Sequence, residues 1–375
     1  MIEATTPGGA AGTGKRTVLH FVTGGFSGAT QVAVDLALAQ LQSAHIAPLL
    51  VLRRKLHTDE GRVQALRDRG LQVWVVNGWT HLSAILSLRR LCLALRPDVL
   101  IAHGFPEHLI GRHAGLWAGV PHLVQVEHNS RERYTPWRLA QARWLAARSA
   151  KLVGVSEGVR RRLVELGMPE AKTIAIPNGI ALERFRAPPA FAEREAGIVM
   201  SARFARQKDH LTLIRALGLL KQRGLTPQLS LAGAGKAGGR RKAQALVARL
   251  GLAGQVKFLG HHDGIPELLM SQQIFVLATH WEGMPLALVE GMAAGCACVA
   301  SAAPGVEGVF EDGRSGLLVR PANPEALADT LERLLRDPAL AARLGGAARE
   351  HALAEHGREL MMQRYEELLL SIMAG

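Results

Sequence analysis

Two glutamates that bracket one short run are the strongest sign of chemistry in this chain. The run reads Glu282-Gly-Met-Pro-Leu-Ala-Leu-Val-Glu290 and lies between two apolar stretches, residues 274–278 and 296–300. This pattern predicts a strand, a loop, a short helix and a second strand. Glu290 is the only polar side chain of the predicted helix, and a helix that is apolar all round is usually buried. We therefore expect this carboxylate to face a ligand cavity or a protein partner.

Glu282 is predicted to lie on the loop that precedes this helix. In a parallel sheet, a loop at the carboxyl end of a strand lines the ligand crevice. Pro285 suits the first helical position, and Gly295 suits the residue just past the helix end. The alternative interpretation is that both glutamates are ordinary solvated acids, one on a loop and one on a helix.

Two cations follow another predicted strand, residues 198–201. Arg203 and Lys208 lie in the loop between this strand and a helix predicted over residues 209–223. Two cations at the mouth of a sheet can neutralise a diphosphate and stabilise it as a leaving group. Taken alone, the pair is better explained as ordinary surface charge on a loop.

Three glycine-rich segments resemble ligand-binding loops. Gly9–Lys15 fails as a phosphate-binding P-loop, because Arg16 replaces the required Ser or Thr and the segment precedes the first strand. Gly233–Gly238 matches the dinucleotide fingerprint, but no acid ends the next strand, so a nicotinamide cofactor is disfavoured. Gly24 and Gly25 join the first strand to the first helix, where glycine serves either a close ligand approach or a tight turn.

The composition is that of a folded protein with two domains. The chain has 375 residues, of which 48% are hydrophobic, enough for two cores. Residues 1–16 lack the apolar centre of a signal peptide and are predicted to be flexible, and no apolar run is long enough to span a membrane. Cys92, Cys296 and Cys298 make no disulfide framework and are predicted to pack as small apolar residues rather than to bind metal. These features favour a cytoplasmic location.

Positive charge is concentrated in the first half of the chain. The formal net charge is +13, and most of the excess arginine precedes residue 190. Nucleic acid binding is one interpretation, but neither zinc-finger spacing nor an aromatic RNA-stacking pattern accompanies the charge. A phosphate-bearing acceptor or an anionic membrane surface fits a cytoplasmic enzyme better, with solvated arginines as the alternative.

Strands and helices alternate twice along the chain. Strands are predicted at 17–22, 47–52, 73–76, 99–102, 122–126, 152–155 and 173–176, and, after a Pro-containing linker, at 198–201, 228–232, 256–259, 274–278, 296–300 and 317–319. Such alternation with helices indicates α/β domains with parallel, doubly wound sheets. We predict a first domain over residues 17–187 and a second over residues 188–357, with a ligand cleft between them.

Together these segments resemble retaining glycosyltransferase family four, whose members have the GT-B fold of two Rossmann-like domains. The matching motifs are Arg203 and Lys208, Leu231-Ala-Gly233-Ala-Gly235, Phe258-Leu-Gly260, Glu282-Gly283-Met284-Pro285, Glu290, and the stretch from Pro304 to Val319. Ala181 departs from the pattern by replacing an acid. His356-Gly357-Arg358 replaces an aromatic pair before the final helix, residues 358–375, which the family folds back onto the first domain.

The resemblance implies roles for residues of the second domain. Glu290 would bind the ribose hydroxyls of a nucleotide-sugar donor, and Glu282 would bind hydroxyls of its sugar. Arg203 and Lys208 would balance the diphosphate charge, so that no metal is needed, and with Glu282 they are predicted to be catalytic. The other donor-binding positions are the glycine turn at Gly233, the base-binding main chain at Gly260, His261 and His262, and the backbone of Gly283, Met284, Pro285 and Leu286.

The resemblance also implies roles in the first domain. The loop with Gly24 and Gly25 would approach the diphosphate and the acceptor. His128, which follows a predicted strand, matches the family's active-site histidine and is the fourth predicted catalytic residue. His103 and Asn129 are further candidates on the acceptor side.

The implied activity is retaining, metal-independent transfer of a sugar from a UDP- or GDP-sugar to an acceptor hydroxyl, without a cofactor. The acceptor would be a lipid-linked or phosphorylated glycan of bacterial polysaccharide, lipopolysaccharide or glycolipid synthesis. The enzyme would be peripheral on the inner face of the cytoplasmic membrane, with no nucleic acid as partner. A sugar-nucleotide epimerase and a phosphorylase are alternatives with the same fold. Outside the fold, the alternatives are an NAD(P)-dependent oxidoreductase and a non-catalytic binding module.

Overall fold

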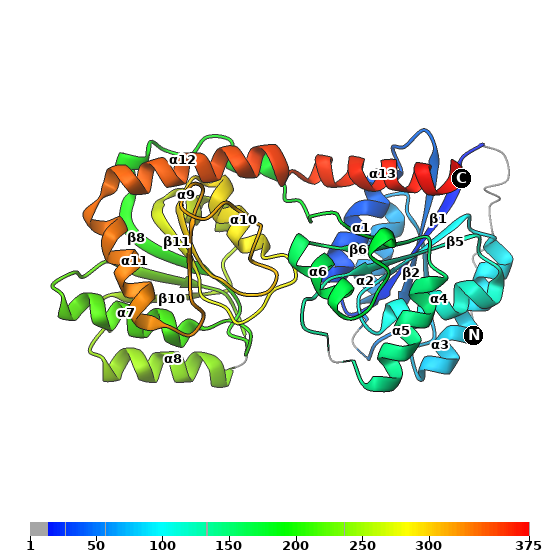
Figure 1. The fold of residues 1–375 in the computed structure, drawn as a ribbon, viewed down its shortest axis with the longest axis horizontal. Coiled ribbons are helices and arrows are strands. Elements are labelled where there is room, and N and C mark those ends of the chain that lie inside the picture. Colours follow the sequence, from blue (N-terminus) through cyan, green and yellow to red (C-terminus); the bar gives the residue numbers. More distant parts are fainter. Residues whose placement is uncertain (1–13, 27, 57, 133, 236, 375) are drawn as a thin grey trace. The chain divides into compact units, whose positions relative to one another are not determined.

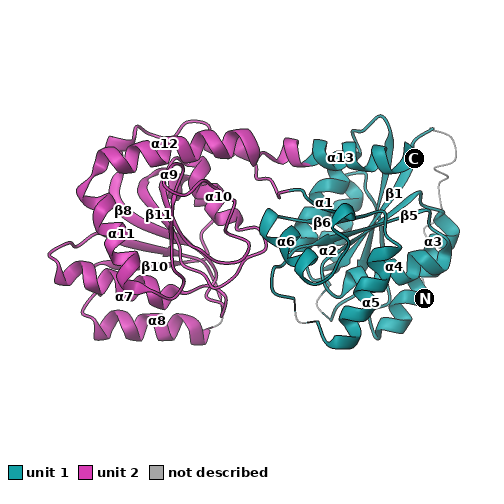
Figure 2. Ribbon diagram, in the orientation of Figure 1, with its two compact units in different colours: residues 1–176, 362–375 teal, residues 177–361 magenta. Residues whose placement is uncertain are grey.

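The computed structural model describes residues 14–26, 28–56, 58–132, 134–235 and 237–374. The chain divides into two compact units, one up to residue 176 together with residues from 362 onward, the other over residues 177–361 (Figure 2). Each unit is an α/β domain with one parallel sheet. The predicted fold class is therefore confirmed.

The first unit is built on a seven-stranded parallel sheet with strand order β3-β2-β1-β4-β5-β6-β7 (Figure 1). Its strands are β1 (Arg16–Thr23), β2 (Ile46–Arg53), β3 (Gln72–Val76), β4 (Val99–His103), β5 (His122–Glu127), β6 (Lys151–Gly154) and β7 (Thr173–Ala175). Its helices are α1 (Gly28–Gln40), α2 (Glu60–Asp68), α3 (His81–Leu95), α4 (Glu107–Ala118), α5 (Pro136–Ala147) and α6 (Glu157–Glu165), with a 3-10 turn at Glu170–Lys172. The strand order reverses at β1, and ligands of such sheets bind at the carboxyl ends beside the reversal.

Helices cover both faces of this sheet. Leu19 and Phe21 of β1 pack with α3 and α4, whereas Val22 packs with α1 and α2 on the opposite face. Because both faces are covered, the central strands are apolar at nearly every position, as is typical of parallel sheets. Buried polar positions in these strands are therefore exceptional, and they include His20 and His103.

The second unit is built on a six-stranded parallel sheet with strand order β10-β9-β8-β11-β12-β13. Its strands are β8 (Glu195–Ser201), β9 (Leu229–Ala232), β10 (Val256–Gly260), β11 (Gln272–Leu277), β12 (Ala297–Ser301) and β13 (Leu317–Val319). Its helices are α7 (His210–Gln222), α8 (Ala237–Arg249), α9 (Ile265–Met270), α10 (Leu286–Ala293), α11 (Pro324–Arg336) and α12 (Pro338–Glu355), with 3-10 turns at Leu182–Phe185 and Phe191–Glu193. The division between the units falls within the last helix, α13 (Arg358–Ala374).

Successive residues of β11 face opposite cores of the second unit. Ile274 and Val276 pack with α7, α8 and α11, while Phe275 and Leu277 pack with α9, α10 and α12. This period of two is what burial of a strand on both faces requires. The apolar run that the sequence shows here is thus explained by two separate cores.

The short helix α10 matches the prediction with one correction. Gly295 follows its end with a φ of +76°, in the left-handed region that favours glycine. Pro285 is the N-cap rather than the first helical residue, because its ψ of 79° is not helical, and the helix begins at Leu286. An added Cβ at Gly291 would lie 2.6 Å from Phe275 Cγ, so α10 and β11 are in close contact there.

The limits of the structural units differ from the predicted domain limits. Phe185 lies in the core shared with α9 and α10, and Ile180 pairs with Gly357, so the segment 177–187 is part of the second unit. The first strand begins at Arg16. Residues 1–13 lie outside the described residues. They include most of the segment predicted to be flexible and most of the rejected P-loop.

The cysteines and the helices bear on two further predictions. Cys92, Cys296 and Cys298 are free thiols, and all three are buried among apolar side chains. Burial raises the pKa of Cys92 and of Cys296 to about 12, so both are neutral packing residues, as predicted. In the part of the chain that the structure describes, no helix is both long enough and apolar enough to cross a bilayer.

We expect Gly291→Ala to destabilise the protein by about 1–3 kcal/mol, because the added Cβ must push α10 away from Phe275. The matched control is Gly346→Ala in α12, where an added Cβ meets no atom within 4 Å and alanine favours the helix by about 0.5–1 kcal/mol. Thermal unfolding followed by circular dichroism measures both. Equal melting temperatures for the two variants would show that this contact does not fix α10.

Candidate functional site

The strongest candidate site lies at the carboxyl ends of β8 and β11. These strands are parallel neighbours, so the loops that follow them leave from the same edge of the sheet. Lys208 comes from the loop after β8, and Glu282 comes from the loop after β11. A backbone bridge between Lys208 and Thr279 joins the loops, and Lys208 Nζ lies 2.6 Å from Glu282 Oε1. The structure thus brings together two residues that the sequence singled out.

The carboxylate of Glu282 is buried and already bonded by protein donors. Only 4% of the residue is exposed. Its Oε1 accepts hydrogen bonds from Lys208 Nζ and Thr279 Oγ1, both at 2.6 Å. Its Oε2 accepts one hydrogen bond from Gln207 Nε2 at 2.7 Å. Because each carboxylate oxygen offers about two acceptor positions, only Oε2 keeps a position for a further hydroxyl.

A second loop fixes the backbone of Glu282. Its N–H donates to Pro304 O at 2.8 Å. Gly305 lies so close that a Cβ there would be 2.1 Å from Glu282 O, and its φ of +85° lies in the region that favours glycine. The Pro304–Gly305 motif therefore holds the Glu282 loop in place, and a side chain at position 305 would displace it.

Glu290 lies half-buried on α10, as the apolar helix around it predicts. Burial raises the pKa of its carboxyl, while the positive charge of Arg184 acts in the opposite direction. Within the described residues no hydrogen bond to its side chain is recorded, in contrast to Glu282. Its carboxyl oxygens therefore keep acceptor positions for ligand hydroxyls.

The start of α10 offers fewer free amides than the sequence suggests. Pro285 has no N–H, and the Leu286 N–H donates to Met284 O at 3.0 Å within the turn. The Leu288 N–H donates to Pro285 O at 2.8 Å. Gly283 and Pro285 are buried, whereas Met284 and Leu286 are partly exposed. Of the backbone contacts predicted for this segment, those of Pro285 and Leu286 thus lack a free donor.

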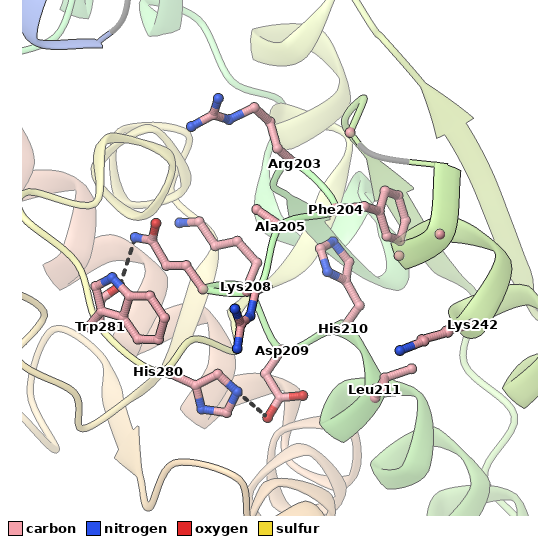
Figure 3. A pocket seen from close by; sticks show the side chains of 15 residues that line it. Arg203, Phe204, Ala205, Lys208, Asp209, His210, Leu211, Lys242, His280 and Trp281 are labelled. Atoms are coloured by element: carbon pink, nitrogen blue, oxygen red, sulfur yellow. Dashed lines mark hydrogen bonds and ion pairs between the residues drawn. The ribbon is translucent and has the colours of Figure 1, made fainter.

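A cavity of about 740 Å³ opens beside the loop after β8 (Figure 3). The residues that line it include Arg203, Phe204, Lys208, His210, Lys242 and Trp281. Phe204 and His210 stack with ring centroids 4.1 Å apart, and burial lowers the pKa of His210. Arg203 is exposed, extends away from Phe204 and His210 (Figure 3), and takes no part in the hydrogen bonds around Glu282. The two predicted cations therefore differ: Lys208 is held, and Arg203 is open to solvent.

The glycine turn after β9 packs against protein backbone. An added Cβ at Gly233 would lie 2.1 Å from Ala202 O, and one at Gly235 would lie 2.6 Å from Phe204 N. The Phe204 N–H also donates to Ala234 O at 2.9 Å. Close approach of the loop after β8 thus explains these glycines, and their match to the dinucleotide fingerprint is no independent sign of a cofactor.

The predicted base-binding segment follows β10 at the same edge of the sheet. Gly260 turns the chain with a φ of +69°. His261 is exposed, with Nε2 3.2 Å from Asp263 Oδ1, and His262 is half-buried. Since β9 lies between β8 and β10, this segment and the Arg203 loop lie on either side of the glycine turn.

In the first unit, three histidines form a hydrogen-bonded chain from the interior of the sheet to the end of β5. His20 Nδ1 lies 3.1 Å from His103 Nε2, and His103 Nδ1 lies 3.3 Å from His128 Nε2. The inner end is Gln40 of α1, whose Oε1 lies 2.8 Å from His20 Nε2. His103 is only 1% exposed, so this predicted acceptor-side residue contacts His128 instead of solvent.

This chain fixes where the histidines carry their protons. Gln40 Oε1 can only accept, so His20 is protonated at Nε2 and accepts at Nδ1. His103 then donates from Nε2 and accepts at Nδ1, and His128 donates from Nε2, which leaves His128 Nδ1 as an acceptor. Burial lowers the pKa of His20 and of His128 to about 4 and that of His103 well below its usual value. All three are neutral at pH 7, and because the Gln40 amide cannot take up a proton, the chain orients His128 rather than conducting protons.

The loop glycines of the first unit have different surroundings. Gly24 is buried, and an added Cβ would lie 2.8 Å from Arg53 O, which also accepts from the Gly24 N–H. Gly25 is exposed, and an added Cβ would meet no atom closer than 3.7 Å. The turn explanation therefore suits Gly24, while Gly25 is exposed and its N–H donates to Thr23 Oγ1 at 3.4 Å. Asn129 caps the next turn, where its Oδ1 accepts from the Arg131 N–H at 3.2 Å.

The acid beside His128 anchors its loop. Glu127 is buried, and burial raises its pKa to about 8. Its Oε1 accepts from the His128 N–H at 3.0 Å, and its Oε2 lies 3.4 Å from the hydroxyl of Tyr134. Over the described ranges, no group of three or more His, Cys, Asp or Glu side chains is placed to hold a metal ion.

The partners that complete both clusters were not predicted from the sequence. Thr279 and Gln207 bond Glu282, and a polar residue at a strand end, or next to Lys208, is a signal that could have found them. His20 and Gln40 orient His128. A polar residue inside an apolar strand marks His20, but nothing in the sequence pattern marks Gln40.

Two family models match the chain. Glycosyltransferase Family 4 matches residues 26–184, and Glycosyl transferases group 1 matches residues 182–351. The first match falls almost wholly in the first unit and the second in the second unit. Together they account for nearly the whole described chain up to α12.

Individual proteins and solved structures show the same likeness. EpsD of Bacillus subtilis (strain 168) is 30% identical over 56% of this chain, and the match spans 58% of EpsD, little more than half its length. UDP-Gal:alpha-D-GlcNAc-diphosphoundecaprenol alpha-1,3-galactosyltransferase of Escherichia coli is 26% identical over 69% of this chain and 72% of that protein. Among solved structures, Anabaena Alr3699/HepE in complex with UDP matches with a TM-score of 0.82 and 20% identity over 95% of this chain and 100% of that chain. This last match shows the shared fold.

We expect the free energy of unfolding to fall as the pH drops from about 6.5 to about 4. In this range the unfolded chain takes up protons that the buried His20 and His103 and the partly exposed His128 do not, which costs about 1.4 kcal/mol per pH unit for each histidine. Glu127 has the opposite effect. Because its pKa is raised in the folded state, its contribution to the free energy of unfolding falls as the pH rises toward about 8. Urea unfolding at a series of pH values measures the sum.

A matched pair of variants isolates the histidine chain. His20→Gln removes one titrating group and should lower the slope of the free energy of unfolding against pH by the contribution of one histidine. His45→Gln alters an exposed histidine and should leave the slope as it is. If both variants keep the wild-type slope, the neutral state of the chain is refuted.

Proposed function

Because the chain belongs to the GT-B glycosyltransferases of family 4, we propose that it moves a sugar from a nucleoside-diphosphate sugar to an acceptor hydroxyl. The observation that carries this proposal is the cluster of Lys208, Thr279 and Gln207 around the Glu282 carboxylate. The cluster fixes one acceptor position on Oε2 at the sheet edge where ligands of such folds bind. A directed carboxylate of this kind suits a ligand rich in hydroxyl groups.

The second unit would bind the donor. Glu282 Oε2 would accept a hydrogen bond from one sugar hydroxyl, and Glu290 would accept hydrogen bonds from the ribose. Arg203 is exposed and would turn toward the diphosphate, which Lys208 would approach from the Glu282 side. We propose a UDP-sugar as the donor, since UDP is bound in HepE and UDP-Gal appears in the name of the Escherichia coli relative.

The proposed reaction breaks the bond between the anomeric carbon and the diphosphate oxygen and forms a bond to the acceptor oxygen. As the diphosphate leaves, the anomeric carbon becomes oxocarbenium-like, and fixed positive charge stabilises the departing group. The acceptor hydroxyl attacks from the face that the diphosphate leaves, and a phosphate oxygen takes its proton. The anomeric configuration is then retained without a covalent intermediate. Arg203 and Lys208 supply the positive charge, so the proposal requires no divalent metal.

For the first unit we propose an acceptor-binding role. Gly25 offers exposed backbone after β1, and His128 offers an oriented Nδ1 acceptor after β5. A lipid-linked or phosphorylated glycan is the acceptor class we propose, because the Escherichia coli relative is named for a diphosphoundecaprenol substrate. The protein would act in bacterial polysaccharide, lipopolysaccharide or glycolipid synthesis, in the cytoplasm and at the inner membrane face.

Two other activities are less well supported. An epimerase or a phosphorylase would use the same donor contacts, and it would consume the donor without a glycan acceptor. An NAD(P)-dependent oxidoreductase would need room for a pyrophosphate at the Gly233 turn. Ala202 O lies directly beside that turn, which disfavours this alternative.

We expect Glu282→Ala and Lys208→Ala each to lower the transfer rate by at least about 100-fold, because loss of a group that stabilises developing charge costs this much. Glu350→Ala and Lys221→Ala, exposed positions on α12 and α7, are the matched controls and should keep the wild-type rate. The assay is product formation from a radiolabelled donor, with circular dichroism to verify folding. NMR of the wild-type product should show the donor's anomeric configuration. Full activity in either site variant would remove Glu282 and Lys208 from the mechanism.

We expect EDTA to leave the transfer rate unchanged, because protein cations balance the diphosphate charge in the proposed mechanism. The measurement compares initial rates of metal-stripped enzyme with and without added Mg²⁺ or Mn²⁺. A rate that EDTA abolishes and one of these ions restores would contradict metal-independent transfer.

A further inference from the structure

Three neighbouring helices of the first unit expose large apolar side chains, which are leucines on α3 and tryptophans on α4 and α5. Helix α4 packs against both α3 and α5 (Figure 1). Trp117 of α4 is 48% exposed, and Trp137 and Trp144 of α5 are 72% and 44% exposed. These are three of the six tryptophans in the chain. A folded protein gains nothing in its own core from side chains so exposed.

The aromatic side chains form a connected surface. A groove of about 350 Å³ is lined by Leu82 of α3, Trp117 of α4 and Trp137 of α5, among others. The His113 ring stacks on Trp144 with centroids 5.9 Å apart and lies 5.8 Å from the Trp117 ring. The surface made by Leu82, His113, Trp117, Trp137 and Trp144 is called the tryptophan face below.

Helical spacing extends the tryptophan face along two helices. Leu82, Leu86 and Leu93 of α3 are exposed, and positions four and eleven residues apart fall on one side of a helix. Trp137 and Trp144 are seven residues apart on α5, which also places them on one side. Each helix therefore has one stripe that packs inward and a second apolar stripe that faces outward.

Positive charge accompanies this face and negative charge avoids it. Helices α3 and α5 contain no acidic residue, and Glu107, the acid of α4, is buried in an ion pair with Arg53. The Arg148 guanidinium lies 3.9 Å above the Trp144 ring, and Arg89 Nε donates to Trp117 O at 3.0 Å. Arg138 lines the groove itself. The cations are thus part of the aromatic surface rather than neighbours of it.

We propose that the tryptophan face docks the protein on an anionic lipid bilayer. Tryptophan favours the headgroup level of a bilayer, where its ring is apolar and its N–H is hydrated. Arginines at the same depth attract anionic headgroups, and their stems cover apolar surface. Charge complementarity selects this partner, because the face combines a wide apolar area with arginines and no acid. The inference does not depend on the proposed sugar transfer, since docking needs neither donor nor acceptor.

Vesicle flotation of the full chain tests this proposal. We expect the protein to float with vesicles of equal amounts of phosphatidylcholine and phosphatidylglycerol, and to bind pure phosphatidylcholine vesicles at least about tenfold more weakly, because the arginines then lack their partners. Absence of flotation with both vesicles, with a folded protein, would overturn the proposal. Such an outcome would leave the transfer assay unaffected, so the two claims fail separately.

Matched variants assign the binding to this face. Trp137→Ser with Trp144→Ser should weaken vesicle binding at least about tenfold, whereas Leu353→Ser, an exposed leucine of α12, should not. Arg138→Gln with Arg148→Gln should remove the preference for phosphatidylglycerol. Arg241→Gln with Arg249→Gln removes equal charge from α8 in the second unit and should keep that preference. Equal losses in the face variants and their controls would overturn the assignment.

A second measurement avoids dependence on variants that fold poorly. Tryptophan fluorescence of the wild-type chain should shift to shorter wavelength with phosphatidylglycerol vesicles and be quenched by brominated lipid in them. Unchanged fluorescence in floated protein would place the contact elsewhere and overturn the proposal. Sedimentation without lipid tests whether the tryptophan face binds a second copy of the chain. A dimer that the Trp137→Ser/Trp144→Ser variant cannot form would show that it does and would overturn the proposal.

Discussion

A buried carboxylate is stable only when protein groups donate hydrogen bonds to it, and the loops around Glu282 in the second unit supply these donors. Leaving such a charge unpaired costs several kcal/mol. Here Lys208, Gln207 and Thr279 provide the donors, and all of them lie on the loops that leave the carboxyl ends of β8 and β11. The pairing therefore ties the two loops to each other, and the Pro304–Gly305 segment closes over them. The remaining acceptor position on Glu282 is directed by this arrangement rather than by the glutamate alone.

The first unit orients its candidate residue by a different physical means. His128 is held by a chain of neutral imidazoles that ends at an amide, so its orientation depends on hydrogen-bond direction and not on charge. Burial keeps His20, His103 and His128 uncharged near neutral pH. The second unit uses a fixed ion pair, whereas the first uses fixed tautomers. Both arrangements place one acceptor atom at the carboxyl edge of a parallel sheet.

Much of the fold and part of the site could be predicted from the sequence. Apolar runs located the strands, since burial on both faces makes residues 274–277 of β11 apolar, and glycine marked the end of α10 at Gly295. The strand-end rule also found Lys208 and Glu282. Their hydrogen-bond partners could not be predicted, because Gln40 and Thr279 become neighbours of the site only through tertiary packing. The basic composition of the first half predicted an anionic partner, but only the structure shows that the arginines share a surface with Trp117, Trp137 and Trp144.

The central claim is that the cluster around Glu282 and Lys208 holds a nucleoside-diphosphate sugar. Thermal shift of the intact chain with UDP, GDP, ADP and their sugars, and with NADH and NADPH, tests it most directly. A bound ligand raises the melting temperature in proportion to RT ln(1 + [L]/Kd). We expect a shift with at least one nucleoside diphosphate and its sugar, a much smaller shift in Lys208→Ala, and none with the nicotinamide nucleotides. A shift with NADH or NADPH and none with any nucleoside diphosphate would contradict it.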